Sequence, residues 1–162
     1  MNNPAAEIID IMRAKKLTLG TVESATGGLI AHLLTNVPGS SDVFQGSVIS
    51  YSNGIKMKMV GLKKITLQEY GAVSPQIARI MAKNGRILLG VDICVADTGI
   101  AGPGGAVPGK PVGLFYLGIS HQDGTFTQKH LFRGAREEIK QQAAQAALTW
   151  VQEYLKELPA EN

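Results

Sequence analysis

The chain has 162 residues, the size of one domain and too short for two ordinary ones, so we predict a single domain over residues 1–162. Hydrophobic residues make up 44% and charged residues 18%, which excludes an intrinsically disordered chain and allows a sizeable core. The formal net charge of +3 is spread along the chain, which argues against direct binding of nucleic acid and fits an anionic small molecule as the ligand at least as well.

The first half of the chain alternates between helical and strand-like hydrophobic patterns. A polar turn at residues 23–28 separates a strand from a helix, and Ser52 and Asn53 suit the N-cap of a short helix that ends at Met59. The other elements predicted here are helices over residues 5–16 and 29–34 and strands over residues 17–22 and 43–51.

Ser74 and Pro75 begin a helix in the second half, because serine is a good N-cap and proline is favoured at the first helical position. Asp123 and Gly124 predict a tight turn between two strands. The elements predicted here are helices over residues 75–89 and 136–158 and strands over residues 91–96, 112–120 and 125–132. Interleaved helices and strands indicate an α/β protein, and the late hairpin predicts a mixed sheet of about five strands.

The one cysteine, Cys94, lies in an apolar run, so we expect a buried thiol and neither a disulfide nor a thiolate metal site. No apolar run approaches the roughly 18 residues of a membrane span. The N-terminal residues lack the basic start and apolar core of a signal peptide, so we expect a cytoplasmic protein without a membrane segment. The acidic residues, histidines and cysteine show no ligand spacing, so we expect no metal and no cofactor.

Three polar or glycine-rich segments follow or flank predicted strands, at residues 23–28, 51–56 and 98–105. Ligands of open α/β sheets bind beyond the carboxyl ends of the strands, where such loops meet. The placement of these segments therefore predicts one shared site.

The first segment places Ser24 between a strand and a helix, where unpaired backbone N–H groups and the helix dipole favour a negative charge. Gly27 and Gly28 would let a ligand approach the backbone. Ser24 can therefore be a nucleophile or an anion-contacting hydroxyl. The alternative is that Ser24 or Thr26 simply caps the helix.

A serine nucleophile needs a proton acceptor, and the three histidines show no Ser-His-Asp pattern. A lysine whose pKa is lowered by partial burial can take this role, and so can a tyrosine relay, which makes Lys56 and Tyr51 candidates. Alternatively, Lys56 belongs to a solvated basic face together with Lys58.

The third segment has four glycines, but their spacing matches neither a dinucleotide-binding fingerprint nor a P-loop. Its backbone could lie against a ligand, with Thr98 offering a hydroxyl, or it could be a plain crossover between strands. Arg136, at the start of the last helix, could clamp a phosphate or carboxylate, or simply lie at the surface.

Taken together and in this order, several stretches resemble the C-terminal domain of the competence/damage-inducible protein CinA. This family also includes stand-alone nicotinamide-nucleotide amidohydrolases, or NMN deamidases. The resemblance covers about residues 5–157 and depends on six stretches in register rather than on any one of them. The matching stretches are residues 21–29, 37–41, 51–53, 71–74, 98–105 and 110–113, together with Lys56.

The resemblance implies a three-layer α/β/α domain that forms a homodimer. It implies hydrolysis of the carboxamide of nicotinamide mononucleotide to nicotinate mononucleotide and ammonia without a metal. By the same resemblance Ser24 matches the nucleophile, and Tyr51 and Lys56 match its activating groups. Thr98 and the glycines after it match a loop that borders the pocket; the glycines considered for substrate binding are Gly99, Gly102 and Gly104.

Our hypothesis is that Lys56 accepts the Ser24 proton, directly or through Tyr51, while backbone N–H groups of residues 26–28 hold the oxyanion. Arg136 or the glycine loop would anchor the phosphate. The alternative is a catalytically silent nucleotide-binding module linked to competence or the DNA damage response. Asp97 stands where this family usually has a small or uncharged residue, and it could repel a phosphate or pair with Lys110.

Overall fold

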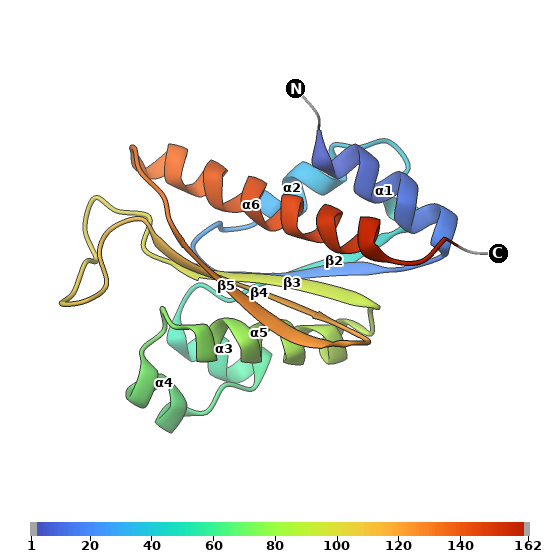
Figure 1. Cartoon of the computed structure of the whole chain (residues 1–162). Coiled ribbons are helices and arrows are strands. Elements are labelled where there is room, and N and C mark those ends of the chain that lie inside the picture. Colours follow the sequence, from blue (N-terminus) through green and yellow to red (C-terminus); the bar gives the residue numbers. More distant parts are fainter. Residues whose placement is uncertain (1–2, 161–162) are drawn as a thin grey trace.

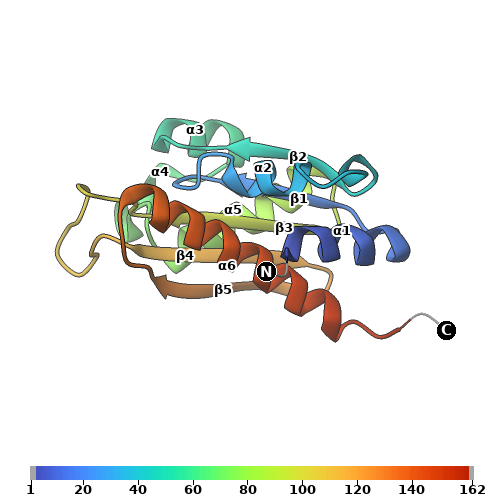
Figure 2. The same cartoon turned by 90° about the horizontal axis from the view of Figure 1, so that it is seen from above.

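The computed structural model describes residues 3–160 and contains a mixed five-stranded sheet between two layers of helices (Figure 1). The predicted α/β/α architecture is therefore confirmed. The strands are β1 (Leu19–Glu23), β2 (Phe44–Ile49), β3 (Ile93–Gly99), β4 (Leu114–His121) and β5 (Gly124–Leu131). Their order across the sheet, visible from above in Figure 2, is β2-β1-β3-β4-β5. The first two residues, which belong to the segment considered for a signal peptide, lie outside the described residues.

Strands β1, β2 and β3 run parallel, whereas β4 is antiparallel to β3 and β5 is antiparallel to β4. On one face of the sheet lie α1 (Pro4–Lys15), α2 (Leu29–Thr35) and α6 (Arg136–Glu157). On the other face lie α3 (Asn53–Val60), α4 (Lys64–Tyr70) and α5 (Pro75–Leu89), and a 3-10 turn spans Ser40–Asp42 before β2. No helix among residues 3–160 is long and apolar enough to cross a membrane.

Each helical layer buries an apolar core against the sheet. The core under α1, α2 and α6 includes Ile8, Leu19 and Leu148. On the opposite face α5 lies close to the sheet at Gly85, where a Cβ would meet the Val22 side chain at 2.3 Å, so only glycine fits there. Cys94 belongs to this second core, and burial raises the pKa of its thiol to about 12, which confirms the predicted buried cysteine.

The structure differs from the predicted elements in two places that matter for the site. Helix α4 was not predicted, because seven residues with Leu67 as their buried member carry too little periodicity to indicate a helix. Strand β3 continues past Ala96 to Gly99, because Asp97, Thr98 and Gly99 pair with β4. Thr98 and Gly99 are therefore strand residues, and the glycine loop proper begins at Ile100.

The three parallel strands end at the same edge of the sheet. Ser24 follows β1, Ser50 and Tyr51 follow β2, and Ile100 follows β3. Parallel pairing of β1 with both neighbours therefore brings the three predicted polar segments to one edge, as expected for an open α/β sheet. The long loop that follows β3, residues 100–113, projects from this end of the molecule in Figure 1.

Candidate active site

A cavity of about 340 Å³ lies at the edge where the parallel strands end. This volume falls in the range of roughly 300–1,000 Å³ that small-molecule pockets occupy. The residues that line it are Ser24, Ala25, Tyr51, Asn53, Lys56, Ala72, Val73, Thr98, Gly99, Ile100, Ala101, Gly102, Gly104, Gly105 and Arg136. The cavity therefore unites residues from all three predicted polar segments with Arg136 from α6.

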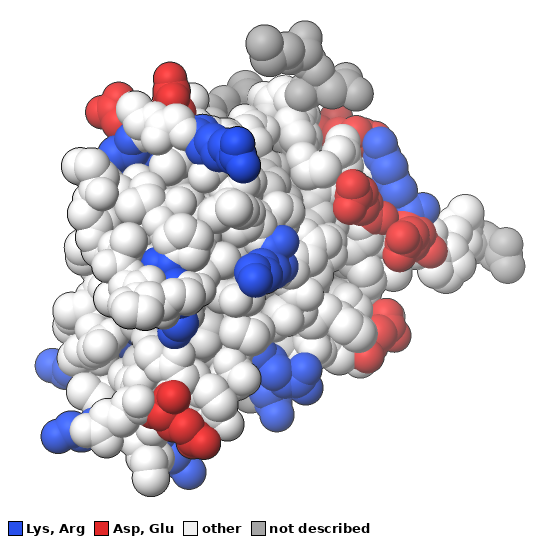
Figure 3. Space-filling view, turned by 60° about the vertical axis from the view of Figure 1, so that its left-hand side comes forward, with Lys and Arg blue, Asp and Glu red and all other residues white. Residues whose placement is uncertain are grey.

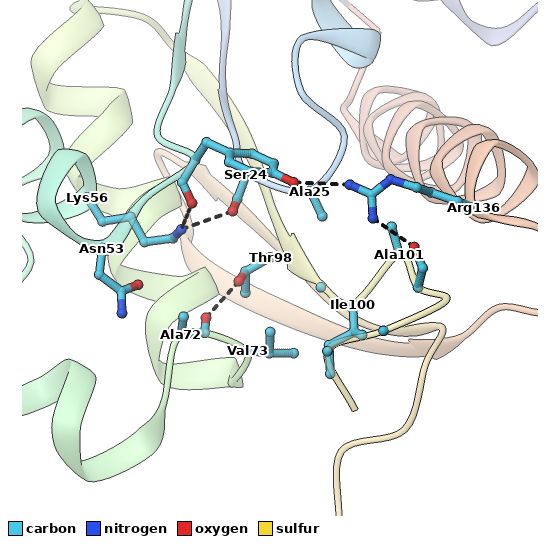
Figure 4. A pocket seen from close by; sticks show the side chains of 15 residues that line it. Ser24, Ala25, Asn53, Lys56, Ala72, Val73, Thr98, Ile100, Ala101 and Arg136 are labelled. Atoms are coloured by element: carbon cyan, nitrogen blue, oxygen red, sulfur yellow. Dashed lines mark hydrogen bonds between the residues drawn. The ribbon is translucent and has the colours of Figure 1, made fainter. Parts of the chain in front are cut away.

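At the bottom of this cavity a lysine amine meets a serine hydroxyl (Figure 4). The Nζ atom of Lys56 lies 3.0 Å from Ser24 Oγ, although 32 positions separate the two residues in the chain. Ser52 caps α3 by accepting a hydrogen bond from the Ile55 N–H, and the first turn of this helix directs Lys56 inward. The two residues predicted as nucleophile and proton acceptor are therefore in hydrogen-bonding contact.

The Lys56 side chain is buried, with 2% of its surface exposed, whereas Lys58 on the same helix is exposed. The hypothesis of a solvated basic face is therefore wrong for Lys56. Burial lowers the pKa of Lys56 because desolvation penalises the ammonium form, and the negative charge of Asp97 opposes this shift. A lysine with a lowered pKa more readily supplies the neutral amine that a general base requires.

Tyr51 contacts Lys56 through its main chain and not through its phenol. The Lys56 amine donates to the Tyr51 carbonyl oxygen at 3.1 Å, whereas the Tyr51 hydroxyl accepts from the Arg136 guanidinium at 3.1 Å. A neutral amine that donates to this carbonyl keeps its lone pair for the Ser24 O–H. The structure therefore supports direct proton transfer from Ser24 to Lys56 and does not support a relay through the Tyr51 phenol.

The backbone N–H groups predicted as oxyanion donors have other partners. The Thr26 N–H donates to Asp97, the Gly27 N–H to the Ser24 carbonyl and the Gly28 N–H to Glu23. None of residues 26–28 lines the cavity. The structure therefore does not present these three donors to the cavity, because buried carboxylates accept from Thr26 and Gly28 and the Ser24 carbonyl accepts from Gly27.

The turn still presents one donor to the cavity. Ala25 lines the cavity, and its backbone N–H has no acceptor among residues 3–160. In α/β-hydrolases, whose nucleophile lies on a strand–turn–helix motif, the N–H of the residue after the serine serves as an oxyanion donor. Ala25 is therefore a better candidate for this role than residues 26–28.

The wall opposite α3 comes from the end of β3 and the glycine loop. Thr98 lines the cavity, and its hydroxyl donates to the Ala72 carbonyl at 2.6 Å, which ties β3 to the segment before α5. Gly99, Gly102 and Gly104 also line it, as predicted. Lining residues that were not predicted for the site are Ala25, Asn53, Ala72, Val73, Ile100, Ala101 and Gly105. Small or apolar residues carry no chemical signal in a sequence, so only the fold could identify most of them.

The charged residues of the cavity lining are both basic. Lys56 and Arg136 line it, and no aspartate or glutamate does. Arg136 donates to the Gly102 carbonyl at 2.7 Å as well as to Tyr51, which uses two of the five N–H donors of its guanidinium. In Figure 3, which shows the end of the molecule that carries the glycine loop, lysine and arginine side chains lie across the middle and acidic side chains lie nearer the edges. The cavity is therefore suited to an anionic ligand.

Asp97 lies behind the turn and not in the cavity. Its carboxylate is fully buried and accepts hydrogen bonds from the Ser24 N–H and the Thr26 N–H, each at 3.1 Å. Lys110 donates to the Tyr70 carbonyl at 2.7 Å and makes no salt bridge with Asp97. The expected Asp97–Lys110 pair is therefore wrong, because Asp97 points to the turn before α2, while the repulsion of a phosphate stays a prediction.

We expect Asp97 to make folding stability depend on pH. Burial raises its pKa from about 3.8 to about 6, with a further contribution from the charge of Glu23. The folded protein then holds the Asp97 proton more tightly than the unfolded chain, so this residue's contribution to the unfolding free energy falls by about 3 kcal/mol as pH rises from 4 to above 6. Urea unfolding at several pH values should show this fall in the unaltered protein and not in Asp97→Asn. Parallel stability curves for the two proteins would contradict the expectation.

Among residues 3–160, no three or more His, Cys, Asp and Glu side chains gather as metal ligands would. The two buried carboxylates near the cavity, Glu23 and Asp97, are instead surrounded by hydrogen-bond donors of the turn. These carboxylate oxygens therefore accept hydrogen bonds from the turn and do not face a common position as metal ligands would.

Residues 1–155 match a family model described as the CinA C-terminal domain. The chain is 46% identical over 153 residues to a CinA-like protein of Leptospira interrogans, an alignment that covers 94% of this chain and 37% of that relative. It is 42% identical over 159 residues to a CinA-like protein of Thermotoga neapolitana, covering 97% of this chain and 39% of that relative. The chain thus spans somewhat over a third of the length of these curated relatives.

Solved structures with the same arrangement of elements are also known. One is the competence/damage inducible protein CihA from Agrobacterium tumefaciens, with a TM-score of 0.91 and 34% identity, covering 97% of this chain and 98% of that chain. Another is the competence damage-inducible protein A from Klebsiella pneumoniae, with a TM-score of 0.94 and 28% identity, covering 98% of this chain and all of that chain. The comparisons therefore extend over the strands and helices that form the cavity.

Proposed function

The chain belongs to the CinA C-terminal domain family, and from this premise we propose that it hydrolyses the carboxamide of nicotinamide mononucleotide to nicotinate mononucleotide and ammonia. The observation that carries the proposal is the contact of 3.0 Å between the buried Lys56 amine and the Ser24 hydroxyl. A hydroxyl beside an amine of lowered pKa is an activated nucleophile for acyl transfer. An amide carbonyl is a suitable target for it.

In the first half of the reaction, Ser24 Oγ attacks the amide carbon and its proton passes to Lys56 Nζ. The carbonyl oxygen becomes an oxyanion, which the Ala25 N–H stabilises from the adjoining turn. The carbon–nitrogen bond then breaks, and Lys56 returns the proton to the leaving nitrogen, so that ammonia departs and an ester to Ser24 remains. Lys56 therefore acts first as base and then as acid.

In the second half, a water molecule attacks the ester carbon and transfers a proton to Lys56. The tetrahedral intermediate collapses, the bond to Ser24 Oγ breaks, and Lys56 gives its proton back to the serine. The product is released as a carboxylic acid, which loses its remaining proton to solvent at neutral pH, and the two basic residues of the lining favour the resulting carboxylate. Lys56 ends the cycle in its starting form.

The phosphate of the substrate would lie near Arg136, away from the reacting amide. The free N–H donors of this guanidinium can form charge-assisted hydrogen bonds with phosphate oxygens. Gly102 and the neighbouring loop residues line the same wall, so the backbone there could approach the phosphate closely. This placement leaves Ser24 and Lys56 for the carboxamide.

The direct test is to incubate the purified protein with nicotinamide mononucleotide and to measure both ammonia and nicotinate mononucleotide. The two products should appear in equal amounts. Nicotinamide riboside, which lacks the phosphate, should react far more slowly. Binding of the mononucleotide without either product would instead support the silent nucleotide-binding module.

We expect Arg136→Gln to weaken substrate binding more than it slows the chemical step. Loss of a charge-assisted hydrogen bond is worth about 1.5–3 kcal/mol, so KM for nicotinamide mononucleotide should rise roughly 10- to 100-fold while kcat changes much less. Steady-state kinetics with the mononucleotide and the riboside measure this effect. Equal losses for both substrates would contradict a phosphate-binding role, because the riboside has no phosphate to lose.

A further inference from the structure

Two fully buried carboxylates share one hydroxyl directly behind the candidate nucleophile. Glu23 ends β1 and Asp97 lies beside it on β3. The Thr26 hydroxyl lies 2.8 Å from Glu23 Oε1 and 2.5 Å from Asp97 Oδ1. A hydroxyl has a single hydrogen, so Thr26 donates to one of these carboxylates at a time, and a proton taken up by the other carboxyl group at low pH would be shared with the same hydroxyl oxygen.

The two carboxylates differ in the number of backbone N–H groups that donate to them. Glu23 accepts from the Gly28, Ile30 and Ala31 N–H groups at 2.9–3.1 Å, at the positive end of α2. It also accepts from the hydroxyls of Thr21 and Ser47. Asp97 has two backbone donors, Ser24 and Thr26. Asp97 therefore has fewer backbone donors to offset its burial, which raises its pKa to about 6.

Ser24 connects Asp97 to Lys56. Its N–H donates to Asp97 Oδ1 at 3.1 Å, while its Oγ lies 3.0 Å from the Lys56 amine on the cavity side. Asp97 and Lys56 form no salt bridge of their own, so the carboxylate acts on the ammonium through space. A negative charge in a buried setting interacts more strongly with such a cation than it would in water.

We infer that Asp97 is a positioning residue of the Ser24–Lys56 pair: it holds the main chain of Ser24 in place, and its negative charge helps Lys56 retain a proton. The functional part of this inference rests on the proposed hydrolase mechanism. The electrostatic part concerns only the protonation of Lys56 and holds whether or not the protein turns over a substrate.

Among residues 3–160, Asp97 makes hydrogen bonds with Ser24 and Thr26, and no lysine or arginine forms a salt bridge with it. Glu23 faces it from β1, and Leu117 pairs with it from β4. Helix α6 contributes Ile139 and Ala143 to the cluster that includes Ala25, and its Lys140 amine lies near Gly27 at the outer side of the turn. Since the pKa of Asp97 is about 6, the carboxylate is mostly ionised at pH 7 and above, where it raises the pKa of Lys56 against the effect of burial.

The experiment is an NMR titration of protein labelled with ¹³C at the lysine ε carbons, with the Lys56 signal assigned by its absence in Lys56→Met. In Asp97→Asn the Lys56 titration should move to lower pH than in the unaltered protein. Asp92→Asn, the same substitution near the other end of β3, should leave it unchanged. A Lys56 titration that does not move in folded Asp97→Asn would overturn the inference.

The pH–rate profile of Asp97→Asn gives a second readout. Its rising limb should move to lower pH together with the Lys56 titration. A merely structural defect would lower the rate without moving this limb. If the NMR shift is present but the protein releases no ammonia from the mononucleotide, the proposed function fails and the electrostatic inference stands. If the protein releases ammonia but neither the Lys56 titration nor the rising limb of the pH–rate profile moves in Asp97→Asn, only the inference about Asp97 fails.

Both carboxylate oxygens of Asp97 accept hydrogen bonds from backbone N–H groups. In Asp97→Asn the side-chain NH₂ group would face the N–H of either Ser24 or Thr26, and two opposed donors can prevent folding. The unaltered protein then supplies the test. As Asp97 loses its proton near pH 6, the Lys56 ε-carbon signal should show a second, smaller inflection at that pH. A single inflection would show that the charge of Asp97 does not reach Lys56.

Discussion

Ser24→Ala should abolish release of ammonia from nicotinamide mononucleotide, with kcat reduced about 10³-fold or more. The substitution removes the oxygen that forms the ester in the proposed mechanism, and Lys56 then has no serine hydroxyl beside it to deprotonate. The fold should persist, because the Ser24 side chain makes one hydrogen bond, worth about 1 kcal/mol, and its N–H to Asp97 remains. Ammonia release under saturating substrate measures the loss.

The control for this variant is Ser41→Ala, which removes an exposed hydroxyl from the 3-10 turn before β2. It should keep full activity. Calorimetric binding of the mononucleotide to Ser24→Ala should remain close to that of the unaltered protein, since the phosphate contacts are intact. Turnover by Ser24→Ala at the normal rate would remove the nucleophile from the mechanism and with it the proposed ester.

Lys56→Met should lower kcat about 10²- to 10⁴-fold, the range that a general base contributes. Methionine fills much of the same buried space but carries no amine. Because burial lowers the Lys56 pKa, the folded state disfavours the ammonium, and removing the amine relieves this cost at neutral pH. The melting temperature should therefore not fall, which separates lost catalysis from lost folding.

The pH dependence of the reaction rate provides a second test of the role of Lys56. The unaltered protein needs neutral Lys56, so its rate should rise with pH through the lowered pKa of this residue, and that limb should be missing from the residual activity of Lys56→Met. Lys58→Met, on the exposed side of the same helix, is the matched control and should behave like the unaltered protein. A Lys56→Arg variant that kept normal activity would contradict the mechanism, because arginine stays charged and cannot accept the proton.

The elements of the fold were largely predictable from local patterns. The N-cap at Ser74 and the proline after it located the start of α5 correctly, and the helix ends at Leu89 as predicted. The short helix α4 and the extension of β3 to Gly99 were not predictable in this way. Both depend on packing or pairing with the following element, α5 for the helix and β4 for the strand, and the propensities of the residues themselves do not indicate such contacts.

The candidate site was only partly predictable. Ser24, Lys56, Thr98 and Arg136 do line one cavity, as expected from their places after the strands and at a helix start. The hydrogen bonds of the glycine turn were not foreseeable: Asp97 accepts from the Thr26 N–H, Glu23 from the Gly28 N–H and the Ser24 carbonyl from the Gly27 N–H. A sequence shows which groups could donate hydrogen bonds but does not show which acceptors the neighbouring strand will bring to them.

The amino-acid sequence alone determined the α/β class, the order of most elements and the set of reactive side chains, since these follow from hydrophobic periodicity, capping residues and side-chain chemistry. Only the tertiary structure decided that Lys56 is buried against Ser24 while Lys58 faces solvent, and that the Tyr51 phenol bonds to Arg136. The reason is that solvation and distance control both pKa and reactivity, and both are properties of the folded arrangement. A lysine two positions away on the same helix has the same chemistry but a different environment.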